Sequence, residues 1–179
     1  MKECNIFVGR FQPLTMGHIK CMEKAYNECG LKTVLFVIDV PEHKVNETHP
    51  FTTDDTFIGL YRRILSQYDF IIDIVKVKSA DILKISEECE SLGYRIASWT
   101  CGADRQESYS KMVARYSERA NLTDDFRMMV LSRNDGISAT KVREYLMNND
   151  FESFINSTPF TEMYEFDYFR LKLKVIALL

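Results

Sequence analysis

The sequence predicts an α/β fold in which helices cover both faces of a parallel sheet of about five strands. Segments typical of strands alternate with segments typical of helices along the 179 residues. The strand segments are short and nearly continuous apolar runs, as expected for strands that are covered on both faces. Residues with phosphate-binding chemistry follow the first, fourth and fifth runs. Because ligands of such sheets bind beyond the carboxyl ends of the strands, the pattern predicts a site there.

The predicted strands are residues 5–9, 33–40, 70–77, 95–101 and 126–131. The run 33–40, TVLFVIDV, is rich in β-branched residues and has the length of a buried strand. Helices are expected at residues 18–28, 53–67, 81–92, 106–120 and 138–147, and the remainder to residue 179 is helical and rich in aromatic side chains. Ser79 is the expected cap of the third helix, and Gly30 and Gly93 are expected to follow the first and third.

We expect residues 1–146 to form one Rossmann-like domain and residues 147–179 to be a C-terminal helical extension of the same domain. The net charge of −3 argues against general nucleic-acid binding, which requires a basic surface. No apolar run approaches the roughly 18 residues of a membrane span. The chain shows no signal peptide, and its five cysteines include no CxxC pair. Reduced thiols and a cytoplasmic location are therefore expected.

The first group of candidate residues follows the first strand, where residues 9–18 read GRFQPLTMGH. A strand ends at Gly9, a short loop turns, and a helix begins near His18. The N-terminus of a helix carries unpaired N–H groups and a partial positive charge, so it favours phosphate. Arg10 adds a fork of donors suited to phosphate, and Gly17 allows a base or a phosphate to approach the backbone.

The second group follows the fifth strand, where residues 137–143 read ISATKVR. Ser138 and Thr140 supply hydroxyl groups in the first turn of a helix, and Lys141 and Arg143 supply positive charge close by. This arrangement predicts a second phosphate-binding helix start in the same protein.

Together the two stretches resemble the nucleotidyltransferase superfamily, whose members carry an [H/T]xGH motif and an ISSTxxR-like motif. The resemblance implies a Rossmann-like fold and transfer of a nucleoside monophosphate from a triphosphate to a phosphorylated acceptor, with Mg²⁺ as cofactor and ATP as substrate. It implies that Thr15, His18 and Arg143 act at the phosphates and that Gly17 lies against the base. The other nucleotide-binding residues that it implies are Gly9, Arg10, Phe11, Ile137, Ser138 and Thr140.

The subfamily that the chain resembles most is the archaeal type of nicotinamide-mononucleotide adenylyltransferase. The opening GRFQP and the stretch His49-Pro50-Phe51-Thr52 are similar to that group, although the arginine usually found shortly after it is replaced by Thr56. Residues 101–105, CGADR, are similar to its nucleoside-binding segment and add Gly102, Asp104 and Arg105 to the candidate site. Trp99 is expected in the core, with stacking on a substrate ring as the alternative.

Several alternatives stay open. Thr15 stands where many members have histidine, so a nucleotide-binding module without catalysis is one of them. A cytidylyltransferase and a pantetheine-phosphate adenylyltransferase are the others, and a homo-oligomer is an expectation by analogy. His43 and His49 match no common metal-site spacing, so we expect a solvated loop and no protein metal site there. Small nucleotides are the expected partners.

Overall fold

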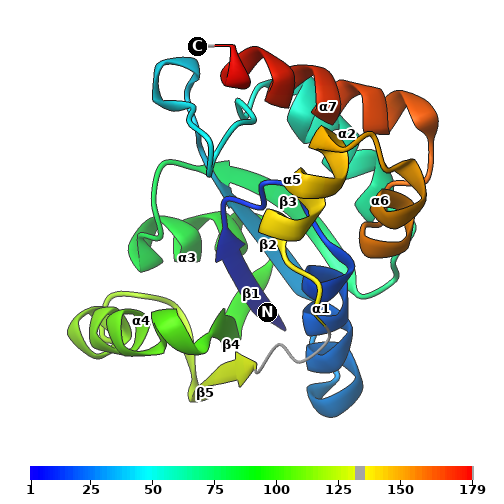
Figure 1. Cartoon of the computed structure of the whole chain (residues 1–179). Helices are drawn as coiled ribbons and strands as arrows, with labels where there is room; N and C mark the ends of the chain where they lie inside the picture. Colours follow the sequence, from blue (N-terminus) through cyan, green and yellow to red (C-terminus); the bar gives the residue numbers. More distant parts are fainter. Residues whose placement is uncertain (132–135, 179) are drawn as a thin grey trace. The chain divides into compact units, whose positions relative to one another are not determined.

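The computed structural model describes residues 1–131 and 136–178, which divide into two compact units (Figure 1). The first unit contains Met1–Gly9, Cys21–Ile38 and Tyr68–Asn134; the second contains Arg10–Lys20, Asp39–Gln67 and Asp135–Leu179. Each unit is therefore assembled from three separate stretches of the chain. The expectation of one domain over residues 1–146 with an extension over 147–179 stays a prediction.

The first unit holds the sheet. Its strands are all parallel and lie in the order β3-β2-β1-β4-β5. The strand bounds are β1 Lys2–Gly9, β2 Thr33–Ile38, β3 Ile71–Val77, β4 Tyr94–Gly102 and β5 Leu122–Leu131. The strand order reverses between β1 and β4, which makes the carboxyl ends of these two strands the topological switch point. The predicted fold class, a Rossmann-like parallel sheet with C-terminal helices, is confirmed.

One face of this sheet packs against α3 (Ile82–Ser91) and α4 (Ala103–Tyr116). Alternate residues of β1 and β2, such as Ile6 and Phe36, form a buried cluster with Ile85 and Tyr109 from these helices. Trp99 of β4 is fully buried in the same cluster and stacks on Tyr109, with ring centroids 4.2 Å apart. The expectation that Trp99 is a core residue is thus confirmed, and the alternative that it stacks on a substrate ring is not supported.

A polar network crosses the middle of the sheet. Asn5 of β1 is fully buried and donates from Nδ2 to Thr33 Oγ1 of β2 over 2.9 Å. Its Oδ1 accepts hydrogen bonds from Ser98 Oγ at 2.7 Å and Thr100 Oγ1 at 3.0 Å, both on β4. Because unpaired buried polar groups are costly, this network favours one register of three neighbouring strands.

Several predicted element ends were wrong for local reasons. Asp81 caps α3, because its carboxylate accepts from the Leu83 N–H at 3.0 Å, and the expected cap Ser79 lies two residues too early. Helix α4 begins directly after β4 at Ala103 and ends at Tyr116, so the predicted range 106–120 was displaced along the chain. Strand β5 begins at Leu122, before the predicted residue 126. Strand β2 ends at Ile38, short of residue 40.

The second unit is helical. It contains the start of α1 (Met16–Cys29), whose later part belongs to the first unit, and a 3-10 turn at Glu42–Lys44. Its other helices are α2 Asp55–Leu65, α5 Ala139–Met147, α6 Phe151–Ser157 and α7 Met163–Ala177. Helices α6 and α7 confirm the predicted helical C-terminal region. None of the helices in the described part of the chain is both long and apolar enough to span a bilayer.

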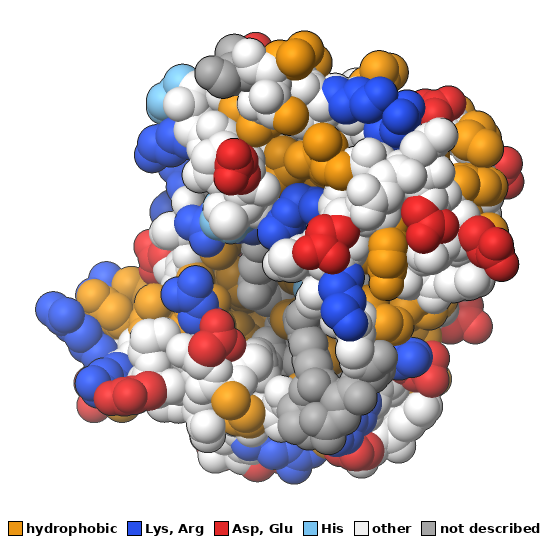
Figure 2. Space-filling view, viewed as in Figure 1, with side chains coloured by type: hydrophobic (Ala, Val, Ile, Leu, Met, Phe, Trp, Pro, Cys, Tyr) orange, Lys and Arg blue, Asp and Glu red, His pale blue; other side chains and the backbone are white. Residues whose placement is uncertain are grey.

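Aromatic side chains form the core of the second unit. Tyr61 of α2 lies against Phe160 and Phe169, with ring centroids 5.6 and 6.4 Å apart. The aromatic residues Phe51, Phe57, Phe154, Phe160 and Phe169 are fully buried. The outer face of α7 instead exposes apolar side chains, including Leu171 and Val175, and Figure 2 shows hydrophobic groups along the edge where α7 runs.

Candidate active site

The loop after β1 holds the side chain of His18 in one orientation. The backbone N–H of Thr15 donates to Nδ1 of His18 over 2.9 Å, and Thr15 Oγ1 lies 3.1 Å from the same nitrogen. Because Nδ1 accepts from an N–H group, the proton of the neutral ring is on Nε2. Thr15 is fully buried, and 6% of His18 is exposed. The loop therefore orients His18 as a hydrogen-bond donor through Nε2.

Tyr61 of α2 fixes the turn that precedes Thr15. Its hydroxyl donates to the carbonyl of Phe11 and accepts from the Leu14 N–H, 2.9 Å away. Burial raises the pKa of Tyr61 well above its ordinary value, so this hydroxyl stays neutral. Phe11 adopts a φ of 51°, which is unfavourable for a residue with a side chain, and its ring meets His18 edge-on at a centroid distance of 4.9 Å.

Gln12 connects the same loop to the segment before α2. Its Nε2 donates to the Phe51 carbonyl and its Oε1 accepts from the Phe51 N–H, each over 2.8 Å. The side chain is buried, with 3% exposed. A side-chain amide that pairs with both backbone groups of one residue holds two loops together much as adjacent strands are held.

The second motif forms the start of α5, as predicted. Ser138 is the N-cap, and its hydroxyl accepts from the Lys141 N–H over 3.1 Å. Arg143 donates from Nη1 to the Gln12 carbonyl over 2.7 Å and from Nη2 to Thr140 Oγ1 over 3.3 Å. Burial lowers the pKa of the Arg143 guanidinium from its ordinary value. One hydrogen bond thus joins two motifs that lie 131 residues apart in the sequence.

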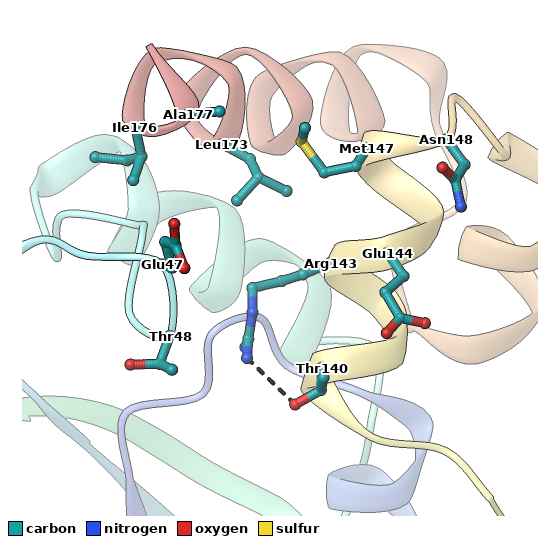
Figure 3. A pocket seen from close by; sticks show the side chains of 10 residues that line it. All are labelled: Glu47, Thr48, Thr140, Arg143, Glu144, Met147, Asn148, Leu173, Ile176 and Ala177. Atoms are coloured by element: carbon teal, nitrogen blue, oxygen red, sulfur yellow. Dashed lines mark hydrogen bonds between the residues drawn. The ribbon is translucent and has the colours of Figure 1, made fainter. Parts of the chain in front are cut away.

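A cavity of about 460 Å³ adjoins Arg143 within the second unit. Figure 3 shows Arg143 reaching from α5 toward Thr48, with Thr140 beside it and Glu47 on the neighbouring loop. Leu173 and other apolar side chains of α7 form the opposite wall, so the cavity has a polar side and an apolar side. The complete lining is Glu47, Thr48, Thr140, Arg143, Glu144, Met147, Asn148, Leu173, Ile176 and Ala177.

His49 follows Thr48 of the cavity lining and interacts with Arg10 and Arg143. The sequence did not predict this position. Burial lowers the pKa of its imidazole below the ordinary value of 6.5, and the nearby guanidinium groups of Arg10 and then Arg143 lower it further. His43, on the same loop, is exposed. Both histidines were expected in one solvated loop, because neither matches a common metal-site spacing.

The second unit holds most of the predicted site residues. Arg10 is exposed, Gly17 is buried, and Ile137 is partly buried just before the cap Ser138. The others that it holds are Phe11, Thr15, His18, Thr140 and Arg143. Gln12, Tyr61 and His49 complete this arrangement and were missed, since each acts through contacts between segments that are distant in sequence.

The remaining predicted residues belong to the first unit. Gly9 ends β1 and Gly102 ends β4, so both lie at carboxyl ends of strands that border the switch point. Asp104 and Arg105 are exposed in the first turn of α4. The Asp104 carboxylate lies over Gly102, where an added Cβ would be 2.7 Å from Oδ1. Glycine is therefore favoured at this position as long as Asp104 keeps this conformation.

The described residues 1–131 and 136–178 contain no group of three or more His, Cys, Asp or Glu side chains placed to hold a metal ion. Part of the cavity lining beside Arg143 consists of hydroxyl and amide groups, which come from Thr48, Thr140 and Asn148 of the second unit. Such groups are suited to bind an anion or a metal–phosphate complex.

Solved structures with the same fold have been described as enzymes of nucleotide chemistry. A bifunctional NMN adenylyltransferase/ADP ribose pyrophosphatase from Francisella tularensis matches with a TM-score of 0.64 and 16% identity, over 99% of this chain and 53% of that one. The chain thus spans about half the length of that protein. A Plasmodium falciparum nicotinic acid mononucleotide adenylyltransferase complexed with NaAD matches with a TM-score of 0.60 and 15% identity, over 100% and 99%. At these identities the likeness shows the fold.

A search among curated proteins found no match. The model of the cytidylyltransferase-like family matches residues 6–145, which are most of the chain and include both candidate motifs. The chain therefore belongs to the cytidylyltransferase-like family, within the nucleotidyltransferase superfamily of enzymes.

Proposed function

We propose that the protein is an adenylyltransferase that transfers AMP from ATP to the phosphate of nicotinamide mononucleotide, giving NAD and pyrophosphate. The observation that carries this proposal is the 2.7 Å hydrogen bond from Arg143 to the Gln12 carbonyl, which joins the two phosphate-binding motifs within one unit. Family membership supports the reaction class. The acceptor is supported by fold neighbours that are named for nicotinamide and nicotinic acid mononucleotide adenylyl transfer.

The proposed reaction is a single in-line displacement. An oxygen of the acceptor phosphate forms a bond to the α-phosphorus of ATP while the bond from that phosphorus to the bridging β-oxygen breaks, and pyrophosphate leaves with the electron pair. No covalent bond to the protein forms. Catalysis then comes from positioning the two substrates and from stabilising charge on the phosphate oxygens.

In this proposal His18 donates from Nε2 to an oxygen of the α-phosphate, where negative charge grows in the transition state. Thr15 is a positioning residue, because it is fully buried and its N–H and hydroxyl face His18 Nδ1. This role differs from direct contact with the phosphate and explains how threonine can serve at a position where relatives have histidine. Catalysis thus does not require a second imidazole.

The start of α5 would hold the β- and γ-phosphates. Ser138 and Thr140 supply hydroxyl groups, Arg143 supplies a fork of N–H donors, and the helix N-terminus adds its partial positive charge. Gly102, Asp104 and Arg105 are proposed to contact the nucleoside, as the resemblance implies, and Gly9 is proposed as a nucleotide-binding residue of the first motif. Gly17 would allow the base to approach the backbone.

Mg²⁺ is part of the proposal as a partner of the triphosphate. One fold neighbour, at 17% identity and a TM-score of 0.61, was solved in complex with AMP and a manganese ion. The hydroxyl and guanidinium groups of Ser138, Thr140 and Arg143 fit phosphate oxygens, which together with water are usual ligands of Mg²⁺ on nucleotides. When bound, the ion would neutralise charge on the departing pyrophosphate.

A cytidylyltransferase is the second candidate, because the family model that matches the chain is described as cytidylyltransferase-like. The two candidates differ in nucleotide and in acceptor. Pyrophosphate release should be measured with ATP and with CTP, each with nicotinamide mononucleotide, nicotinic acid mononucleotide, phosphopantetheine, glycerol phosphate and choline phosphate. We expect release with ATP and a pyridine mononucleotide.

Two other results would replace this proposal. Release only with CTP and an alcohol phosphate would identify a cytidylyltransferase, and release with ATP and phosphopantetheine would move the acceptor to that class. Nucleotide binding by calorimetry without release for any pair would indicate a nucleotide-binding module without catalysis.

A further inference from the structure

Three segments of the second unit meet at Gln12. Its side chain pairs with both backbone groups of Phe51 at 2.8 Å, and its carbonyl accepts from Arg143 Nη1 at 2.7 Å. Residues next to Gln12 and Phe51 are therefore held close to the guanidinium of Arg143. Because Gln12 is buried, these contacts are shielded from competition by water.

Arg10 and His49 are two basic residues that lie close to these contacts along the chain. Arg10 lies two residues before Gln12, and His49 lies two residues before Phe51. Their electrostatic interaction agrees with this placement, since Arg10 and Arg143 both lower the pKa of His49, after the larger effect of burial. Three groups that can carry positive charge thus converge from three different segments.

The loop of His49 faces the same cavity as the start of α5. Thr48, its neighbour in sequence, lines this cavity together with Thr140 and Arg143, and Figure 3 shows these three side chains around one space. His49 is itself partly buried, unlike its exposed neighbours Glu47 and Thr48. This position would place the imidazole at the edge of the proposed triphosphate site.

The contacts of the loop indicate which nitrogen of His49 carries the proton. Thr48 Oγ1 donates its only proton to Asn46 Oδ1 over 2.8 Å, so it can only accept from His49 Nδ1, which lies 3.3 Å away. Neutral His49 then has its proton on Nδ1 and none on Nε2. A second donor, on Nε2, arises only when the ring takes up a proton.

We propose that His49 is a further binding residue for the triphosphate tail, where it acts with Arg10 and Arg143 and takes up one proton as the anion binds. This inference rests on the proposed function, because it assigns a third cationic group to the same phosphate site. Two guanidinium groups oppose a third positive charge before the anion is present. A bound polyphosphate reverses the sign of the local field and favours the protonated ring.

The acidic groups nearby do not remove this effect. Glu47 on the same loop and Glu144 on α5 line the neighbouring cavity, and both are exposed to solvent. Solvent screens these exposed carboxylates and the exposed Arg10 alike, whereas the guanidinium of Arg143 is partly buried. The charged groups that lower the pKa of His49 are Arg10 and then Arg143.

The test is calorimetric titration of the whole protein with inorganic tripolyphosphate, without acceptor and therefore without turnover. Wild type, His49→Gln and His43→Gln are compared in two buffers that differ in ionisation enthalpy, so that proton uptake is measured together with affinity. The His43 variant is the matched control, because it changes the same residue type on the exposed part of the same loop. Protons gained or lost by tripolyphosphate itself contribute equally to the titrations of all three proteins.

We expect His49→Gln to weaken binding about tenfold, which is about 1.4 kcal/mol, and to remove most of the proton uptake seen in wild type. His43→Gln should match wild type in both respects. Unchanged affinity and proton uptake in His49→Gln would overturn this inference and leave the proposed function standing. A wild-type protein that does not bind tripolyphosphate would overturn this inference, and the proposed function as well if no substrate pair releases pyrophosphate. His49-dependent binding without pyrophosphate release from any substrate pair would overturn only the proposed function.

Discussion

The backbone N–H of Thr15 donates to Nδ1 of His18 over 2.9 Å, whereas Nδ1 of His49 lies 3.3 Å from the Thr48 hydroxyl. His18 has its donor proton on Nε2 in the neutral ring. His49, whose Nδ1 faces the Thr48 hydroxyl, offers a donor on Nε2 only when the ring is charged. Turnover through His18 and anion binding through His49 should therefore respond differently to pH.

Replacement of His18 by alanine should lower kcat by about a hundredfold or more, the typical effect of removing a donor that stabilises transition-state charge. The KM for ATP should change much less, because the contact strengthens mainly in the transition state. Steady-state pyrophosphate release checks this, with His43→Ala as the control for loss of an exposed imidazole. A His18→Ala enzyme with a near-normal kcat would remove His18 from the reaction.

Replacement of Arg143 by alanine should raise the KM for ATP about tenfold to a hundredfold, because a charged donor to phosphate is lost together with the bond to the Gln12 carbonyl. Arg143→Lys should recover only part of this, since an ammonium group lacks the planar fork. Initial rates over a range of ATP concentrations measure both. Arg119→Ala, an exposed change in the first unit, is the control. An unchanged KM would show that α5 does not hold the triphosphate.

The KM for ATP should rise with pH between about pH 6 and 8 more steeply in wild type than in His49→Gln. Burial, Arg10 and Arg143 lower the pKa of His49 in the ligand-free protein, and bound triphosphate raises it. The affinity for ATP is therefore constant at a pH below the pKa of His49 in the free protein. It falls as the pH rises from that pKa to the pKa of His49 in the complex, and it is constant again above the latter. Protonation of ATP itself affects both proteins equally, so it cancels when their KM profiles are compared. Parallel profiles would contradict the proposed charge on His49.

Replacement of Asn5 by alanine should lower the free energy of unfolding by about 3 kcal/mol, because Ser98 and Thr100 would lose their buried acceptor. Urea unfolding followed by circular dichroism measures the change. Asn27→Ala, on the exposed surface of α1, should have little effect. If the two variants were equally stable, the network across β2, β1 and β4 would not contribute to register.

The sequence predicted the strands well because their signal is local. A run such as residues 33–38 is apolar throughout and needs no partner to be recognised. Helix starts were less predictable where two residues compete, as with Ser79 and Asp81, since both are good caps and only the fold decides between them. The start of α4 was missed because Gly102 ends a strand and begins a helix without an intervening loop.

The candidate site was predictable where it depends on motifs and not where it depends on distant contacts. Thr15, His18, Ser138 and Arg143 lie in patterns that can be read in the sequence. The side chain of Gln12 forms a hydrogen bond with Phe51, 39 residues away, and its carbonyl accepts one from Arg143. Gln12 lies in the stretch GRFQP and His49 begins the stretch HPFT, but neither local pattern indicates these contacts.

The burial of the single tryptophan against Tyr109 has a practical consequence. Fluorescence excited at the long-wavelength edge of the indole absorption, where tyrosine and phenylalanine do not absorb, comes from Trp99 and so from the sheet-containing half. A denaturation curve recorded in this way follows the strands alone. Comparison with a probe attached near α7 would reveal whether the two halves melt together or in succession.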